Sequence, residues 1–238
     1  LLMLKAILFD LDGTLLPSDQ DEFTAKYFEA LAKCHAMHGN DPKRVVDCVW
    51  KGTVAMLKNK GEDTNENVFW RVFEAEFGQS KAEIKPIFDE FYANGFDEIK
   101  SLCGFTEKAN MAIKAAKAHG VPVVLATNPI FPIEAQAKRA EWAGVDSQDF
   151  TFITSYENSR YCKPRPEYYM DIANELGVST EECLMIGNDT SDDMIAAKIG
   201  MKVFLITDCL INKPDLDISV FPHGDAGELV EFLKALEL

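Results

Sequence analysis

The hydrophobic positions of this chain fall into two patterns, which predict strands and helices in alternation. Short apolar runs bounded by turn-forming residues predict buried strands at 5–9, 121–126, 150–154, 183–187 and 202–206. Amphipathic stretches predict helices between and after the later runs, near 106–119, 132–143, 166–176, 190–199 and 225–236. Because alternating strands and helices pack as a parallel sheet covered on both faces, we expect an α/β fold.

Between the first two expected strands, residues 18–95 show only helical patterning. The expected helix starts are Ser18 with Asp21 as a capping partner, Asp41 before Pro42, Thr64 or Asn65, and Ser80 with Glu83. The expected helix ends are near His38, Lys58, Gly78 and Asn94. We therefore expect a small all-α cap domain over residues 17–99, inserted after the first strand of a core domain made of 1–16 and 100–238. The joints near 16–18 and 95–104 are expected to be flexible.

Composition narrows the class of protein. The chain has 238 residues, of which 47% are hydrophobic, enough for a substantial core. A formal net charge of −15 disfavours nucleic acid and anionic membranes as partners. No apolar stretch approaches the roughly 20 residues of a membrane span, and no secretory signal pattern stands at the N-terminus. The six cysteines form no CxxC pair and have no His cluster beside them, so we expect free thiols in a reducing cytoplasm and no zinc site.

The first expected strand ends in two carboxylates, Asp10 and Asp12, and Gly13 follows at once. A tight turn can bring both carboxylates to one cavity, and glycine permits the backbone conformations that such a turn needs. Two close carboxylates repel each other and therefore call for a cation, a proton or a division of roles. The pattern favours Mg²⁺-assisted chemistry with one nucleophile and one acid/base, although Asp-x-Asp alone also fits a solvated turn.

Polar groups also follow the second and third expected strands. The Thr127 hydroxyl and the Asn128 N–H can hold a phosphate oxygen, or can belong to an ordinary Thr-Asn-Pro turn. Lys163 stands before Pro164, which favours an extended backbone at that lysine. Its ammonium can neutralise both a carboxylate and a phosphate, or can simply be solvated.

The fourth expected strand is followed by Gly187-Asn188-Asp189-Thr190-Ser191-Asp192-Asp193. Hard oxygen ligands of this kind suit Mg²⁺, whereas Asp, Thr and Ser are also ordinary helix caps. In an open parallel sheet, ligands bind outside the carboxyl ends of the strands. The four polar clusters are therefore expected to converge on one site.

With these motifs in this order, the chain resembles the haloacid dehalogenase superfamily, in its phosphoglycolate phosphatase-like and β-phosphoglucomutase-like branch with a helical cap. The matching motifs are Asp10-Leu11-Asp12-Gly13-Thr14, Thr127, Lys163 and Gly187 to Asp193. The resemblance covers essentially the whole chain. It implies a Rossmann-like core sheet with the cap inserted between the first two motifs.

The resemblance implies a Mg²⁺-dependent phosphatase that acts through an aspartyl-phosphate. Asp10 would be the nucleophile and Asp12 the general acid/base. An aspartate at position 12 also favours phosphate chemistry, since the dehalogenases of the family lack it. The remaining implied roles are phosphoryl binding by Thr127, Lys163 and the N–H groups of Leu11 and Asn128, and orientation of Lys163 by Asp193.

Two positions depart from the family pattern. Asn188 stands where an Asp is common, and Asp189 follows it. The implied metal ligands are Asp10 and Asp12 with Asn188, or with Asp189 if the register shifts by one residue. A neutral Asn188 would bind the metal more weakly than an Asp. Arg165 replaces an Asp that can cap the next helix, where it is either exposed and tolerated or adds positive charge near the substrate.

The implied substrate is a small phosphorylated metabolite, such as phosphoglycolate or a sugar phosphate. We expect a monomer or a weak dimer, since the cap already covers the site while an exposed helical face could pair. Candidate cap contacts are the cations Lys51, Lys58, Lys60 and Arg71, and the aromatic residues Trp50, Phe69 and Trp70. At helical spacing, such aromatic residues are typical of a core. Two alternatives stay open: a phosphomutase of the same superfamily, and a non-catalytic binding or regulatory protein that retains the fold.

Overall fold

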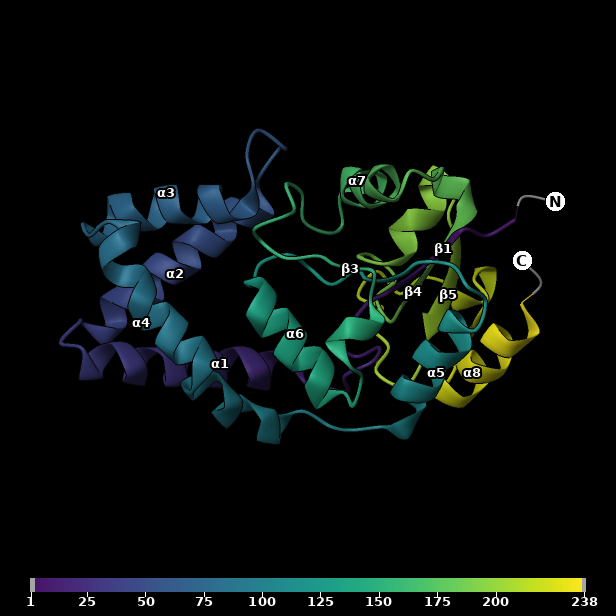
Figure 1. Ribbon diagram of the computed structural model, residues 1–238, viewed down its shortest axis with the longest axis horizontal. Coiled ribbons are helices and arrows are strands. Elements are labelled where there is room, and N and C mark those ends of the chain that lie inside the picture. Colours follow the sequence, from purple (N-terminus) through teal and green to yellow (C-terminus); the bar gives the residue numbers. More distant parts are fainter. Residues whose placement is uncertain (1–2, 237–238) are drawn as a thin grey trace.

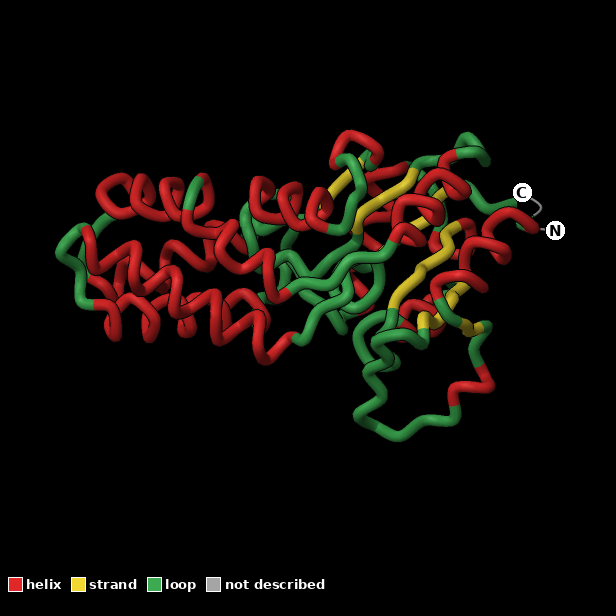
Figure 2. Tube along the Cα trace, turned by 90° about the horizontal axis from the view of Figure 1, so that it is seen from below, coloured by secondary structure: helices red, strands yellow, loops and turns green. Residues whose placement is uncertain are grey.

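The computed structural model describes residues 3–236 as a parallel sheet with helices on both faces and a group of helices beside it (Figures 1 and 2). The sheet has the order β3-β2-β1-β4-β5-β6, and every neighbouring pair is parallel. Its strands are β1 (Ala6–Phe9), β2 (Val123–Leu125), β3 (Phe152–Ile153), β4 (Cys183–Gly187), β5 (Lys202–Ile206) and β6 (His223–Gly224). The predicted α/β fold is confirmed, and the edge strand β6 is an addition to it.

Helices cover both faces of the sheet. They are α5 (Glu107–Lys117), α6 (Ile133–Trp142), α7 (Pro166–Leu176) and α8 (Ala226–Ala235), joined by the short 3₁₀ helices η2 (Ser147–Asp149), η3 (Thr180–Glu182), η4 (Met194–Ile199) and η5 (Ile218–Val220). Successive side chains of a strand point to opposite faces, so Ala6 and Leu8 pack in one apolar cluster with α7. Ile7 and Phe9 pack in a second cluster with α5 and α8.

The first four α-helices after β1 form what we call the helical insertion. They are α1 (Gln20–Met37), α2 (Pro42–Leu57), α3 (Asn65–Phe77) and α4 (Lys81–Ala93), and the 3₁₀ helix η1 (Gly95–Leu102) follows them. Three predicted starts are confirmed: Asp41 and Thr64 accept first-turn N–H groups, and Ser80 with Glu83 forms a capping box. The predicted start at Ser18 is one residue early, because the Asp19 carboxylate accepts the N–H groups of the first turn.

The predicted amphipathic helix at 190–199 is wrong. Residues 190–193 form turns, and only the 3₁₀ helix η4 follows them. The side chains there bond elsewhere: Thr190 donates to Asn212 at 2.9 Å, and the Asp193 carboxylate accepts from Lys163 and from the Asp189 N–H. Such bonds compete with the helical backbone ladder.

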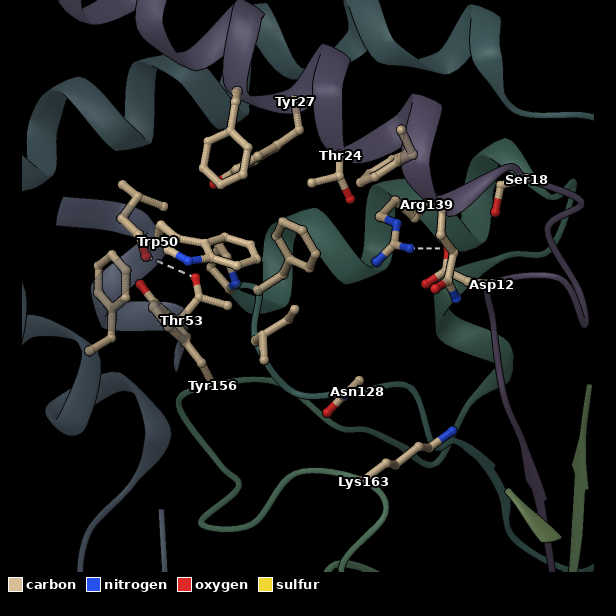
Figure 3. Close-up of a pocket in the computed structure, with 18 of the residues that line it drawn as sticks. Asp12, Ser18, Thr24, Tyr27, Trp50, Thr53, Asn128, Arg139, Tyr156 and Lys163 are labelled. Atoms are coloured by element: carbon tan, nitrogen blue, oxygen red, sulfur yellow. Dashed lines mark hydrogen bonds and ion pairs between the residues drawn. The ribbon is translucent and has the colours of Figure 1, made fainter. Parts of the chain in front are cut away.

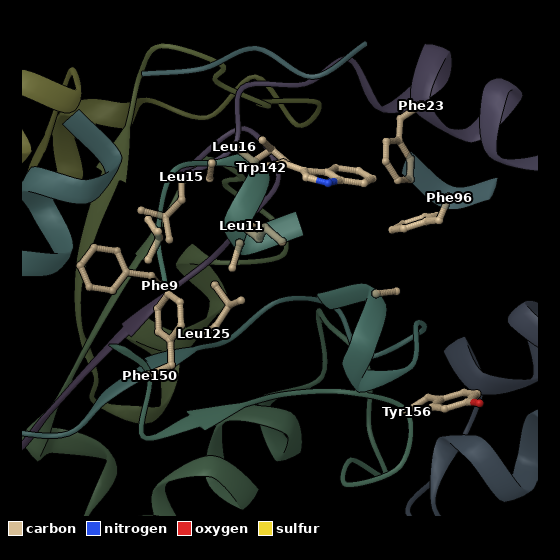
Figure 4. Close-up of a cluster of buried hydrophobic side chains, with 14 of the residues drawn as sticks. Phe9, Leu11, Leu15, Leu16, Phe23, Phe96, Leu125, Trp142, Phe150 and Tyr156 are labelled. Atoms are coloured by element: carbon tan, nitrogen blue, oxygen red, sulfur yellow. The ribbon is translucent and has the colours of Figure 1, made fainter. Parts of the chain in front are cut away.

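The helical insertion is joined to the core by buried contacts. The joint expected near residues 95–104 is the 3₁₀ helix η1, in which Phe96 and Ile99 are fully buried. Figure 4 shows Phe96 beside Phe23 of α1. Asn65, at the start of α3, is fully buried: its N–H donates to the Ser159 carbonyl at 2.8 Å and its amide donates to the Pro129 carbonyl at 3.1 Å. The division into cap and core domains stays a prediction. None of the helices within residues 3–236 has the length and apolarity of a membrane span.

Candidate active site

A buried chain of charges lies at the carboxyl end of β1. Asp10 follows the strand directly, and its Oδ1 accepts a hydrogen bond from Lys163 Nζ at 2.7 Å. The same ammonium donates to Asp193 Oδ1 at 2.6 Å, so one lysine connects two carboxylates from distant segments. Lys163 is 5% exposed and Asp193 is 1% exposed. Lys163 comes from the loop after β3, in which the Lys163–Pro164 peptide is cis.

Burial dominates the titration of these groups. It raises the pKa of Asp10 to about 7, against the opposing effect of the Lys163 charge. Burial also raises the pKa of Asp193, and Lys163 again opposes the change. Burial alone would lower the pKa of Lys163, but the two carboxylates hold it well above its usual value. Two carboxylates against one ammonium leave an excess of buried negative charge, which favours binding of a further cation.

The residues beside Asp10 fit a divalent metal ion. The Thr14 hydroxyl lies 3.3 Å from Asp10 Oδ2 and 3.1 Å from Asn188 Oδ1. A hydroxyl has one hydrogen, so Thr14 can donate to only one of these two oxygens. A cation bound between the oxygens would interact with both. Asn188 is oriented by donation from its amide nitrogen to the Cys209 carbonyl at 2.6 Å. Gly13 has φ of 77°, and a Cβ there would lie 2.3 Å from Asn188 Nδ2, so only glycine lets Asn188 approach.

Asp189 is engaged differently. Its Oδ1 accepts the N–H groups of Ser191 at 2.6 Å and Asp192 at 3.0 Å, as in a turn cap. Burial and the neighbouring Asp189 raise the pKa of Asp192. Both of these carboxylates line the same cavity as Asp10. The geometry therefore brings Asn188, rather than Asp189, against the proposed nucleophile.

Arg139 is a site residue that sequence reasoning missed. Its guanidinium forms an ion pair with the Asp12 carboxylate, drawn as a dashed line in Figure 3, and donates to Gln136 at 3.0 Å. The side chain is 2% exposed, and the rings of Phe23 and Phe131 lie 4.9 and 5.2 Å from it. It lies within α6, whose amphipathic pattern is explained without it, and only the fold brings it to Asp12.

The structure brings most predicted site residues to one cavity of about 350 Å³. Those that line it are Asp10, Asp12, Asn128, Lys163, Asn188, Asp189 and Asp193. Thr127 and Leu11 do not line it. Thr127 is buried, and its carbonyl accepts bonds from the hydroxyls of Thr154 at 2.6 Å and Tyr168 at 2.8 Å. Phosphoryl binding by Thr127 and Leu11 therefore stays a prediction.

The helical insertion contributes aromatic rings and Lys85 of α4 to the cavity, but none of the cations expected from the sequence. Lys51 pairs with Glu76 at 2.5 Å and Arg71 with Asp63 at 2.7 Å, and neither these residues nor Lys58 and Lys60 line the cavity. The three aromatic residues singled out from the sequence do line it, together with the cations Lys85, Arg139 and Lys213.

Arg165 lies outside the lining of the cavity, at the N-cap of α7, and makes no capping hydrogen bond. We expect Arg165→Asp to raise the free energy of unfolding by about 1 kcal/mol relative to Arg165→Ala, because a carboxylate caps a helix start and matches its dipole. Denaturant unfolding checks the difference. A fall in kcat/KM for Arg165→Ala would instead place Arg165 among the substrate contacts.

A second group of potential ligands lies in the helical insertion. Cys34 and His38, four residues apart at the end of α1, meet Glu90 of α4, with His38 Nε2 3.1 Å from Glu90 Oε2. Cys34 is buried and the other two are exposed. The sequence did not indicate this cluster, because the third member comes from another helix. All six cysteines are free thiols.

Comparisons with known proteins agree on one family. A family model described as haloacid dehalogenase-like hydrolase matches residues 4–200. A bifunctional riboflavin kinase/FMN phosphatase of Arabidopsis thaliana is 27% identical over 236 residues, 98% of this chain but 55% of that protein, so the chain spans about half its length. An N-acetylmuramic acid 6-phosphate phosphatase of Pseudomonas aeruginosa is 26% identical, over 84% of this chain and 80% of that protein.

A solved structure shows that the fold itself is shared more widely. The 2-haloacid dehalogenase of Pseudomonas syringae superposes with a TM-score of 0.61 at 18% identity, over 97% of this chain and 98% of that one. At this identity the likeness concerns the fold alone.

Proposed function

Because this chain belongs to the haloacid dehalogenase-like hydrolase family, we propose that it is a phosphatase that hydrolyses a small phosphate monoester with Mg²⁺ through an aspartyl-phosphate on Asp10. The observation that carries the proposal is the hydrogen-bonded chain Asp10–Lys163–Asp193 at the end of β1. Both curated relatives described above are named as phosphatases, one for FMN and one for a sugar phosphate. Residues 17–99 would form a cap domain over the core.

Asp10 is the nucleophile in this proposal. One of its carboxylate oxygens attacks phosphorus while the bond from phosphorus to the alcohol oxygen breaks, which leaves the phosphoryl group on Asp10. Lys163 keeps positive charge beside the attacking carboxylate and the transferring oxygens, and Asp193 holds the lysine in place. The Asn128 N–H, at the cavity wall, would donate to a phosphoryl oxygen.

Asp12 is the proton carrier. It gives a proton to the departing alcohol, then takes one from the water that attacks the aspartyl-phosphate and releases phosphate. Arg139 holds the Asp12 carboxylate at the cavity wall. Because Asp10 and Asp12 are two residues apart with a positive-φ Gly13 after them, the turn keeps both carboxylates at one end of the cavity.

Mg²⁺, held by Asp10, Asp12 and Asn188, would supply positive charge to the transferring phosphoryl group. We expect Asn188→Asp to tighten Mg²⁺ binding by about tenfold, because it replaces a neutral oxygen ligand with an anionic one. Isothermal titration at pH 8 measures the affinity. Asp189→Asn is the control for the alternative register: weaker binding there, with no change in Asn188→Asp, would make Asp189 the ligand.

Phosphate release tests the reaction class. A panel of phosphate monoesters is assayed with Mg²⁺ and with chelator, and Asp10→Asn protein serves as the blank. Mg²⁺-dependent release above the blank supports the phosphatase. A phosphomutase would instead isomerise a sugar phosphate and require a bisphosphate activator, whereas absence of both activities would favour a non-catalytic binding protein.

A further inference from the structure

The cavity continues from the carboxylates into the helical insertion, where its wall becomes aromatic. Figure 3 shows Tyr27, Trp50 and Tyr156 at one end of the cavity, and Asp12, Arg139 and Lys163 toward the other. We call the first end the aromatic chamber, lined by Tyr27, Phe28, Trp50, Phe69, Trp70 and Tyr156.

The rings of the aromatic chamber are arranged as edge-to-face and tilted neighbours. Phe28 and Trp50 have ring centroids 6.2 Å apart, Phe69 and Trp70 are 5.2 Å apart, and Phe69 and Tyr156 are 6.3 Å apart. Trp50 borders the cavity and is 54% exposed. Packing in a buried core therefore does not explain why a tryptophan stands at this position. A ring in the ligand could pack among these faces and edges.

The charges of the cavity argue against a second anion on a ligand in the aromatic chamber. Lys163 and Arg139 are already paired with carboxylates, and Lys85 pairs with Asp89 at 2.6 Å. The fourth cation of the lining, Lys213, acts on the carboxylate end of the cavity, where its charge opposes the burial that raises the pKa of Asp192. Lys81 lies over the Trp70 ring, with its Nζ 5.7 Å from the ring centroid, but it is paired with Glu66 at 2.7 Å. An anionic group in this chamber would therefore lose its hydration without gaining an unpaired cation as a partner.

We propose that the substrate is a phosphate monoester whose leaving group is an uncharged alcohol carrying an aromatic or heteroaromatic ring, which binds in the aromatic chamber while the phosphate meets Asp10 and Lys163. This inference rests on the proposed function and names its substrate class. It disfavours phosphoglycolate and sugar bisphosphates, which carry a second anion.

Three esters with alcohols of similar leaving ability test the class: benzyl phosphate, cyclohexylmethyl phosphate and glycerol 3-phosphate, assayed with Mg²⁺. We expect kcat/KM for benzyl phosphate to exceed that for cyclohexylmethyl phosphate by about three- to tenfold, the size of an aromatic pair interaction. Glycerol 3-phosphate should be poorer still. Equal values would overturn the aromatic preference while leaving the phosphatase intact. Flavin mononucleotide and adenosine monophosphate then distinguish a large ring system from a smaller one.

Binding separates this inference from the reaction. Benzylphosphonate and methylphosphonate cannot be hydrolysed at the P–C bond by this chemistry, so their dissociation constants are measured by titration even if no ester is cleaved. Tighter binding of benzylphosphonate supports the aromatic chamber as the leaving-group site. Equal dissociation constants overturn it, whatever the esters show.

Trp50→Ala identifies the chamber as the source of the preference. We expect it to narrow the ratio of kcat/KM between benzyl and glycerol phosphates by about three- to tenfold, with Trp50→Phe restoring most of the ratio. Phe105→Ala is the matched control, because Phe105 is an aromatic residue that is 64% exposed and lies outside the cavity lining. An unchanged ratio in Trp50→Ala would overturn the assignment of this ring.

Discussion

Asp10→Asn is expected to lower phosphate release by at least about 10³-fold, because it removes the nucleophile while keeping the shape of the side chain. The protein should remain folded: the new amide oxygen can accept from Lys163 and the amide nitrogen can donate to the Thr14 hydroxyl. Steady-state kinetics on the best ester of the panel measures the fall. Residual activity near the wild-type value would exclude Asp10 as the nucleophile.

Asp10→Asn should raise the free energy of unfolding although it lowers the activity. Burial raises the pKa of Asp10 to about 7 in the folded protein, whereas an aspartate in the unfolded chain has a pKa of about 4. The neutral Asp10 therefore stabilises the fold fully below about pH 4, and this stabilisation is lost as the pH rises through about 7. An amide stays neutral throughout. In chelator, we therefore expect Asp10→Asn to be more stable than the wild type at pH 8, with a smaller difference at pH 5. Denaturant unfolding at the two pH values checks the sign.

Lys163→Met is expected to damage both activity and folding. Two buried carboxylates, Asp10 and Asp193, would lose the cation between them, and breaking a buried ion pair from one side costs about 3–5 kcal/mol. The rate should fall about 10²- to 10⁴-fold, since charge on the transferring group is no longer neutralised. Unfolding at pH 8 and steady-state kinetics measure the two effects.

The pH dependence and a double variant provide the controls for Lys163→Met. Without the lysine, burial raises both carboxyl pKa values unopposed, so the stability deficit should shrink as the pH falls and the carboxylates take up protons. Adding Asp193→Asn should restore part of the stability but not the activity. A deficit that is the same at pH 5 and pH 8 would mean that lost packing, rather than unpaired charge, is responsible.

Much of the fold could be predicted from sequence because its strands are buried on both faces. Continuous apolar runs marked β1, β2, β4 and β5 directly. The edge strand β6 contains only His223 and Gly224, too short and too polar for a periodicity signal. The turn at 190–193 was missed because its side chains bond to distant residues, which a local pattern does not record.

The candidate site, like the fold, could be predicted from the sequence only in part. Motifs at strand ends converge because parallel strands share one edge, which places Asp10, Lys163 and Asn188 together. Arg139 could not be predicted, because its partner Asp12 lies far away in sequence and a lone arginine in an amphipathic helix carries no signal. The sequence singled out Trp50 and Trp70 as aromatic residues typical of a core. Only the three-dimensional structure shows that both also line the cavity.

The sheet topology also bears on the order of assembly during synthesis. The central strand β1 pairs residue 7 with residue 123 and residue 6 with residue 183, so both of its neighbours are made long after it. At roughly 5–20 residues per second, β1 therefore waits several seconds or more on the ribosome before β2 emerges. The helical insertion is made in that interval. The first apolar surface that β1 meets after synthesis is therefore that of the insertion helices, and its partner strands come later.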